Sequence, residues 1–372
     1  MKHKTDVVSF NILSTRAFLE SKDTAVSIAL ITSGSTDGGV GTVSSKLDEG
    51  LRLDGFEVER IALAGNFFTI GISDLGLLRS LMKFDTIIYL GSFAHLSHFF
   101  TRGPKTALFV HGFVKDERLH QVLEGKYRSR IGGLMLLSYG QLFNMSQRFS
   151  CMDFYIGQSE TVREMNAIRK PFAELKQFLL PREILSGERI GRSDDFGNAS
   201  RPVTILVYLG STDSPRLLTP AELSNIIYGV RKKCNGNFRF IVIDPKRRLM
   251  PSNNVEVIDF LPRKEFLRVL LDSDMYFERC VDEELGFTSI EAALYGIPVA
   301  KITLGRYKER CDYNENEILT ATSLHEMSTR IASFIENARY QGAVFGSEIK
   351  EFVSRKRTWD AVKEQLIAFI DA

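Results

Sequence analysis

Short runs of apolar, mostly β-branched residues alternate along the chain with longer stretches of mixed polarity. Continuous apolar runs are typical of parallel strands that are buried on both faces. In the first half the pattern predicts strands at Val26–Thr32, Glu57–Leu63, Thr86–Leu90, Thr106–Val110 and Phe154–Gly157. Helices are expected over 42–53 and directly after Ser159, whose hydroxyl suits a helix N-cap. The alternation predicts an α/β unit built on a parallel sheet.

The same alternation begins again after a polar stretch. Residues 186–200 are rich in glycine, serine and charge, and we interpret them as a linker. Beyond them the pattern predicts strands at Val203–Leu209, Phe238–Ile243, Val255–Phe260, Asp274–Phe277 and Pro298–Ile302, and helices at Pro220–Lys233, Glu265–Leu271 and Ser289–Tyr295. We therefore expect two domains, 1–185 and 201–355, with the ligand site in a cleft at the carboxyl ends of their strands.

Composition narrows the function classes mainly by exclusion. The 372 residues suffice for about two domains. Charged residues make up 25% and hydrophobic residues 44%, as in ordinary globular proteins. The 48 basic and 46 acidic side chains leave a net charge of +2, so no global field attracts nucleic acid. The basic runs 246–248 and 355–357 are interpreted as solvated faces, and any anion site must be built locally.

The cysteines and the apolar runs indicate a soluble, cytoplasmic protein. None of the 4 cysteines has C-x-x-C spacing, which excludes the usual zinc ribbon and redox dithiol, and so few cysteines fit a reducing cytosol. Residues 1–24 lack the apolar core of a signal peptide. Lys126–Leu137 joins basic residues to an apolar run, and two interpretations stay open: peripheral contact with an anionic membrane or lipid-linked acceptor, or a core helix with a charged start.

The clearest chemical pattern lies between Glu283 and Pro298. Seven residues, including Gly286, separate Glu283 from Glu291. The backbone N–H groups of 286–289 would lie at a helix N-terminus, where a phosphate can bind without a metal. A carboxylate at each end could accept hydrogen bonds from hydroxyls beside that phosphate. The alternative is a plain acidic loop before a core helix.

This segment resembles the E-x7-E motif of retaining glycosyltransferases of the GT-B fold, family GT4, which includes sucrose and glycogen synthases and bacterial mannosyltransferases. The resemblance extends over most of the chain. Other segments similar to elements of that family are Asp37–Gly41, Leu53–Val58, Phe109–Phe113, Ile156–Glu160, Val207–Gly210 and Thr358–Asp360.

The resemblance implies an α/β fold of two Rossmann-like, doubly wound domains, with the helix of 356–372 crossing back to the first. It implies transfer of a sugar from a UDP- or GDP-linked nucleotide-diphosphate sugar to a hydroxyl of a glycan, sugar or lipid-linked acceptor, with no metal and no other cofactor. The first domain would bind the acceptor and the second the donor. The implied catalytic residues are His111, Glu283 and Arg216. The implied donor-binding residues are Gly38, Gly39, Gly41, Gly210, Ser211, Arg216, Gly286, Phe287, Thr288 and Glu291.

Within this scheme Glu283 would lie near the donor sugar hydroxyls and Glu291 would hold the ribose hydroxyls. Arg216 and the backbone of 286–288 would neutralise the diphosphate. His111 would face the donor sugar from the opposite domain, although a histidine at a strand end is often structural. His95 and His98 form an H-x-x-H pair without an evident third metal ligand, so a loop lining the acceptor side is the other interpretation.

The chain departs from the family pattern in the second domain. The family usually has Gly-Arg after the first strand of that domain, whereas Gly210 is followed here by Ser211. Ile243 leads into Asp244-Pro245 instead of Gly-x-Gly, and Glu284 replaces a glycine. These departures leave a second hypothesis open, a degenerate, non-catalytic module of the same fold that binds sugar nucleotides.

Overall fold

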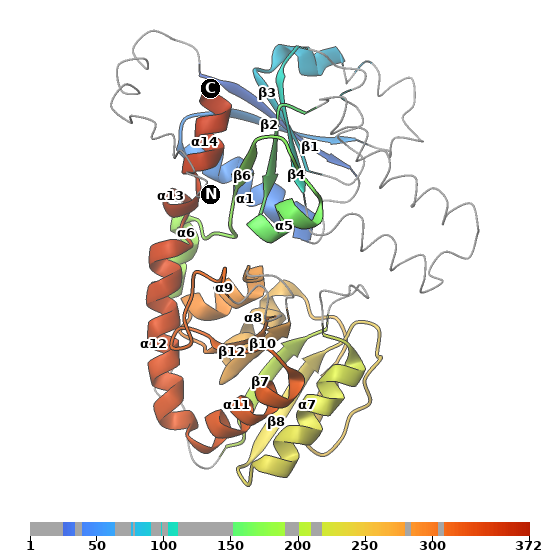
Figure 1. Ribbon diagram of the computed structural model, residues 1–372, viewed down its shortest axis with the longest axis vertical. Helices are drawn as coiled ribbons and strands as arrows, with labels where there is room; N and C mark the ends of the chain where they lie inside the picture. Colours follow the sequence, from blue (N-terminus) through green and yellow to red (C-terminus); the bar gives the residue numbers. More distant parts are fainter. Residues whose placement is uncertain are drawn as a thin grey trace, which may run out of the picture.

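The protein is built on two parallel β-sheets that lie in separate lobes (Figure 1). The computed structural model describes residues 25–33, 39–63, 76, 79–90, 98, 103–110, 152–189, 201–209, 218–279, 284–303 and 309–372. Within these ranges each sheet has six strands, and all the strand pairs in them are parallel. The expected α/β fold with two doubly wound sheets is confirmed.

The strand order of each sheet reverses direction once. In the first sheet the order is β2 (Glu57–Leu63), β1 (Ser27–Ser33), β3 (Thr86–Tyr89), β4 (Lys105–Val110), β5 (Phe154–Gly157) and β6 (Phe172–Glu174). In the second sheet it is β12 (Leu319–Ala321), β11 (Val299–Ile302), β10 (Met275–Arg279), β7 (Val203–Tyr208), β8 (Phe238–Ile243) and β9 (Val255–Ile258). The chain therefore changes direction between β1 and β3, and again between β7 and β10.

Helices cover both sheets. The first lobe carries α1 (Gly39–Leu53), the short 3₁₀ helix η3 (Leu81–Lys83), α5 (Glu160–Met165) and α6 (Pro181–Arg189). The second lobe carries α7 (Pro220–Lys233), α8 (Arg263–Leu271), α9 (Phe287–Leu294) and α11 (Leu324–Glu336). The chain continues through α12 (Ala338–Lys356), α13 (Trp359–Val362) and α14 (Glu364–Asp371). The helix α7 forms where the sequence predicts it because Thr219 and Glu222 make a reciprocal capping box at its start.

The apolar pattern located most strands to within two residues, because buried parallel strands are apolar throughout. It did not find β6, α6, β12, α11 or α12, and the single helix expected over 356–372 is divided into α13 and α14. The stretch 186–200, expected to be a linker, begins inside α6, whose last turn reaches Arg189. The domain boundaries themselves remain a prediction.

The last segment of the chain joins the two lobes. In Figure 1 α12 runs beside the second lobe, and α13 and α14 lie on the first. Trp359 and Leu366 are buried in one core with Leu47 of α1 and Ile28 of β1. The backbone of Leu179 makes hydrogen bonds of 2.6 and 3.0 Å with Arg357 and Trp359. The first lobe therefore completes its core with residues that follow the second lobe in sequence.

Two glycines allow α12 to pack tightly on the end of α9. Gly296 directly follows the C-cap residue of α9 with a φ of +69°, a conformation that favours glycine. A Cβ on Gly346 of α12 would lie only 2.2 Å from the carbonyl oxygen of Gly296. Backbone therefore meets backbone at this crossing, and no flexible side chain can yield.

We expect Gly346→Ala to destabilise the protein by about 2 kcal/mol, because the added methyl group forces α12 away from α9. Ser347→Ala is the matched control, since Ser347 is exposed on the same helix. Thermal unfolding of both variants checks the prediction. Equal midpoints for the two variants would contradict it.

Candidate functional site

The site lies where the second sheet reverses its strand order, at the carboxyl ends of β7 and β10. Ligands of open α/β sheets bind at such a switch point. Here β7 ends at Tyr208 and β10 ends at Arg279. The next described element after β10 is α9, whose N-terminus returns to this edge of the sheet.

A glycine in close contact with a carboxylate forms the N-terminus of α9. Gly286 is the N-cap residue, and its N–H donates to Oε1 of Glu278 at 3.1 Å. A Cβ at this position would lie 2.6 Å from Oε2 of the same carboxylate. Gly286 offers no side chain to cap the helix, so no N-cap side chain bonds to the first-turn N–H groups. The positive end of the helix dipole is thus left suited to an anion.

The N-terminus of α9 faces the first lobe. Phe287 packs against the core that contains α1 and α13. The ammonium group of Lys46 in α1 lies 5.0 Å from the centre of the Phe287 ring. Lys46 is held there because its Nζ donates to the carbonyl of Phe178 at 2.9 Å and to Glu183 at 2.8 Å. A ligand at the start of α9 would therefore lie between the lobes.

Glu291 lies about one turn into α9. Its side chain is 14% exposed, and both carboxylate oxygens accept hydrogen bonds from the guanidinium of Arg263, the first residue of α8. Beneath the same helix, Tyr276 of β10 is buried and hydrogen-bonded to Thr288. Burial, reinforced by the nearby charge of Glu278, raises the pKa of Tyr276 well above its usual value. Its hydroxyl stays neutral and can support Thr288 across the physiological pH range.

The structure brings part of the predicted set together. Gly286, Phe287, Thr288 and Glu291 share the first turns of α9. Gly39 and Gly41 lie in the first turn of α1, so the prediction that the loop extends to Gly41 is wrong. The helix starts early because Val43, Leu47 and Leu51 bury one face of it, which outweighs the poor helix propensity of glycine. Several predicted residues and segments lie outside the described residues: Gly38, His95, His111, Lys126–Leu137, Gly210, Ser211, Arg216 and Glu283.

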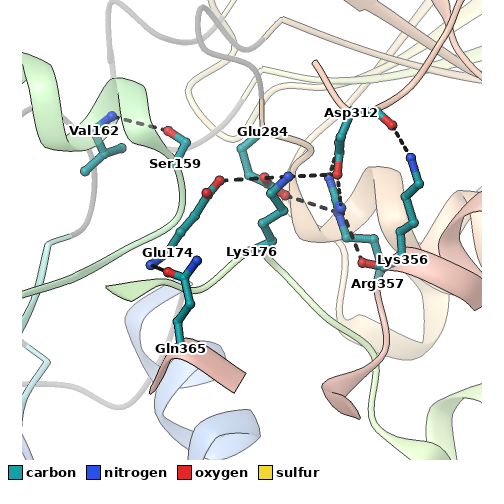
Figure 2. A network of polar contacts seen from close by, with 9 residues as sticks. All are labelled: Ser159, Val162, Glu174, Lys176, Glu284, Asp312, Lys356, Arg357 and Gln365. Atoms are coloured by element: carbon teal, nitrogen blue, oxygen red, sulfur yellow. Dashed lines mark hydrogen bonds and ion pairs between the residues drawn. The ribbon is translucent and has the colours of Figure 1, made fainter. Parts of the chain in front are cut away.

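A buried ionic cluster adjoins this site, and the sequence analysis missed it (Figure 2). Glu284 is 2% exposed and lies next to the predicted Glu283. Its Oε1 is 3.4 Å from Nε of Arg357, which is 0% exposed. Arg357 also donates to both oxygens of Asp312, at 2.7 and 2.8 Å. Lys176, from the segment after β6 in the first lobe, donates to Asp312 at 2.8 Å.

The interpretation of 355–357 as a solvated face is wrong for its last residue. Arg355 is exposed, but Arg357, the C-cap residue of α12, lies four residues beyond Val353 and eight beyond Ile349, which are both buried. Helical spacing from these two apolar residues would have indicated its burial. A buried guanidinium needs carboxylate partners, and Glu284 and Asp312 supply them.

The pKa values of the two carboxyl groups in the cluster are shifted in opposite directions. Burial raises the pKa of Glu284 to about 7, because a nearly complete loss of solvent outweighs the attraction of Arg357. Burial also acts against ionisation of Asp312, but its hydrogen bonds from Arg357 hold the pKa of that carboxyl far below its usual range. Asp312 therefore remains the permanent counter-ion of Arg357, and Glu284 is the group that gains a proton near neutral pH.

Other features of the described residues do not form a site. A hollow of about 880 Å³, lined by Ser27, Glu57 and Asp85 among others, lies at the amino ends of β1, β2 and β3, the edge at which open α/β sheets do not bind ligands. Across the described ranges, no three His, Cys, Asp or Glu side chains gather as a metal site requires. No helix in the part of the chain that the structure describes is both long and apolar enough to cross a bilayer.

Comparison with solved structures identifies the fold. HepE from Anabaena, in a complex with UDP and glucose, superposes with a TM-score of 0.61 at 14% identity, over 93% of this chain and 99% of HepE. Sucrose-phosphate synthase from Thermosynechococcus elongatus superposes with a TM-score of 0.62 at 11% identity, over 93% of this chain and 98% of the synthase. The lipopolysaccharide outer core galactosyltransferase WaaB superposes with a TM-score of 0.56 at 11% identity, over 92% of this chain and 100% of WaaB.

At these identities the likeness concerns the fold, which is GT-B, as the sequence resemblance implied. No protein-family model matches the sequence, and no curated protein sequence matches it.

Replacing Glu284 tests the buried cluster. The folded protein binds the Glu284 proton more tightly than the unfolded chain does, so the stability linked to this group is greatest at low pH and is lost as the pH rises toward and past 7. From pH 5 to 7.5 we expect the stability of the wild type relative to Glu284→Gln to fall by about 2 kcal/mol. Denaturant unfolding at several pH values measures this difference.

Glu351→Gln is the control, because Glu351 is exposed on α12. If Glu284→Gln and Glu351→Gln show the same dependence on pH relative to the wild type, Glu284 does not titrate as described.

Proposed function

We propose that this protein is a retaining glycosyltransferase. It moves a sugar from a nucleotide-diphosphate sugar to a hydroxyl of a glycan, sugar or lipid-linked acceptor, without a metal ion. The observation that carries the proposal is the N-terminus of α9. It is built on Gly286 at the switch point of the donor-side sheet, faces the first lobe through Phe287, and carries Glu291 one turn further on.

The structural neighbours support glycosyl transfer as the general activity. They include a galactosyltransferase and a sucrose-phosphate synthase. HepE is seen with UDP and glucose in one crystal and with UDP-glucose in another. A UDP-linked sugar is therefore the first donor to test, and GDP- and ADP-linked sugars follow.

The chemistry of the proposed reaction explains why a helix terminus is useful. Breaking the bond between the sugar and the diphosphate develops positive charge at the anomeric carbon and negative charge on the departing diphosphate. Fixed dipoles and cations at the leaving group lower the energy of this transition state. The backbone N–H groups of 287 and 288 and the side chain of Arg216 take this role in the proposal, whereas the N–H of Gly286 already donates to Glu278.

The remaining roles follow the family resemblance. Glu291 would hold the ribose hydroxyls, and its ion pair with Arg263 fixes the orientation of the carboxylate before the nucleotide arrives. Glu283 and His111 would face the donor sugar from opposite lobes. The first lobe would bind the acceptor, with Lys126–Leu137 as the proposed contact with a membrane or lipid carrier.

A second candidate function is a non-catalytic module that binds sugar nucleotides. One structural observation favours it: both oxygens of Glu291 already accept a hydrogen bond from Arg263, which leaves each oxygen one lone pair for a ribose hydroxyl. Ser211, in place of the family arginine, points in the same direction. Nucleotide binding without sugar release or transfer would identify this function.

We expect the wild-type protein to release nucleotide from at least one of a panel of UDP-, GDP- and ADP-sugars in the presence of hydroxyl acceptors. Glu291→Gln should reduce donor turnover by about a hundredfold, because the amide offers one acceptor where the carboxylate offers two. Nucleotide release measured by a coupled assay checks this, with the anomeric configuration of the product determined by NMR.

Glu265→Gln is the matched control, since Glu265 is an exposed glutamate in the first turn of α8, near Arg263 in sequence. Full turnover in Glu291→Gln would remove Glu291 from the site. Inversion at the anomeric carbon would disprove the retaining mechanism.

A further inference from the structure

Two departures from the family pattern follow neighbouring strands of the second sheet in sequence. Ser211 follows β7, where the family has an arginine, and Asp244-Pro245 follows β8, where the family has Gly-x-Gly. The strands β7 and β8 are parallel neighbours, so the carboxyl ends that precede the two departures lie at the same edge of the second sheet. This inference rests on the proposed function, because it concerns how the donor diphosphate is held.

The chain after β8 wraps around the carboxylate of Asp244. This residue is 0% exposed. Its carboxylate oxygens accept hydrogen bonds from the backbone N–H groups of Lys246 at 3.3 Å, of Leu249 at 2.9 Å and of Arg248. The guanidinium of Arg248 closes the ring, with Nε 3.0 Å from Oδ1. A carboxylate with this many donors fixes the backbone and the side chain of Arg248 together.

Asp244 places the guanidinium of Arg248 at the end of β7. Nη2 of Arg248 donates to the carbonyl of Leu209 at 3.3 Å, two residues before Ser211. The side chain is 19% exposed, whereas that of the adjacent Arg247 is 77% exposed and pairs with Asp259. The interpretation of 246–248 as a solvated face therefore holds for Arg247 and is wrong for Arg248.

The charge of Arg248 affects the ionisation of Tyr208, which lies at the switch point of the sheet. Burial raises the pKa of Tyr208, the last residue of β7, and the positive charge of Arg248 opposes that rise. Tyr208 in turn interacts with Tyr276, which is hydrogen-bonded to Thr288 at the start of α9. Tyr208 therefore interacts electrostatically both with Arg248 and with Tyr276, which lies beneath the start of α9.

We propose that Arg248 replaces the arginine missing at position 211 and binds the diphosphate of the nucleotide sugar. The glycine turn after β8 has been exchanged for an aspartate that anchors this arginine, so the two departures compensate for each other. The counter-charge of Asp244 lies fully buried behind the guanidinium and is shared with three backbone N–H groups. Because the Arg248 side chain is 19% exposed and that of Asp244 is not exposed at all, the charge that the pair presents to solvent is the positive one.

The test compares ligands that differ only in the diphosphate. Calorimetry measures the affinity for UDP, and ligand-observed NMR measures the affinity for uridine. We expect Arg248→Met to weaken UDP binding by about tenfold or more, with uridine binding unchanged, because the side chain contacts phosphate and not the nucleoside. Arg247→Met is the matched control and should bind both ligands as the wild type does. Arg248→Lys should recover part of the UDP affinity.

Arg248→Met leaves Asp244 buried without its guanidinium, so its unfolding is compared with that of the wild type. If the single variant is unfolded, the double variant Asp244→Asn, Arg248→Met removes both charges and takes its place.

The proposal is overturned if the folded Arg248→Met variant binds UDP as the wild type does, or if its binding of uridine weakens as much as its binding of UDP. It is also overturned if Arg247→Met weakens UDP binding to the same extent. A wild type that binds none of UDP, GDP and ADP would instead refute the proposed function itself.

Discussion

The charge of Arg357 constrains the junction between the two lobes. The side chain is fully buried, so its charge must be balanced by groups that reach it from other elements. Glu284 approaches from the segment before α9 and Asp312 from the second lobe, and Lys176 of the first lobe shares Asp312 (Figure 2). One ionic cluster thereby ties the crossing segment, the start of the candidate site and the first lobe together.

This arrangement gives the glutamate at position 284 a structural role. The residue is not available to a substrate, because burial and Arg357 account for its position. Its backbone carbonyl also accepts a hydrogen bond from the buried Lys301 of β11. The side chain and the backbone carbonyl of Glu284 are therefore both held in place just before α9. This fixes the position of the N-terminus of that helix relative to the first lobe.

Much of the fold could be predicted from the sequence, and the reasons are local. Strands such as β5 and β8 are continuous apolar runs, and α7 has a capping box and a basic last turn. The three-residue strands β6 and β12 are too short to show any period. At the site, the glycine and the carboxylate of α9 could be predicted from spacing. Spacing could also have indicated the burial of Arg357, but the ionic partners of Glu284, Arg357 and Arg248 could not be predicted, because the chain brings them together only on folding.

The return of the chain to the first lobe has a consequence for how the protein is made. Trp359, Leu366 and Ile370 fill the core beside α1 and β1, yet a ribosome adds them after the whole second lobe. Until they arrive, the surface beneath them stays exposed to solvent and to chaperones.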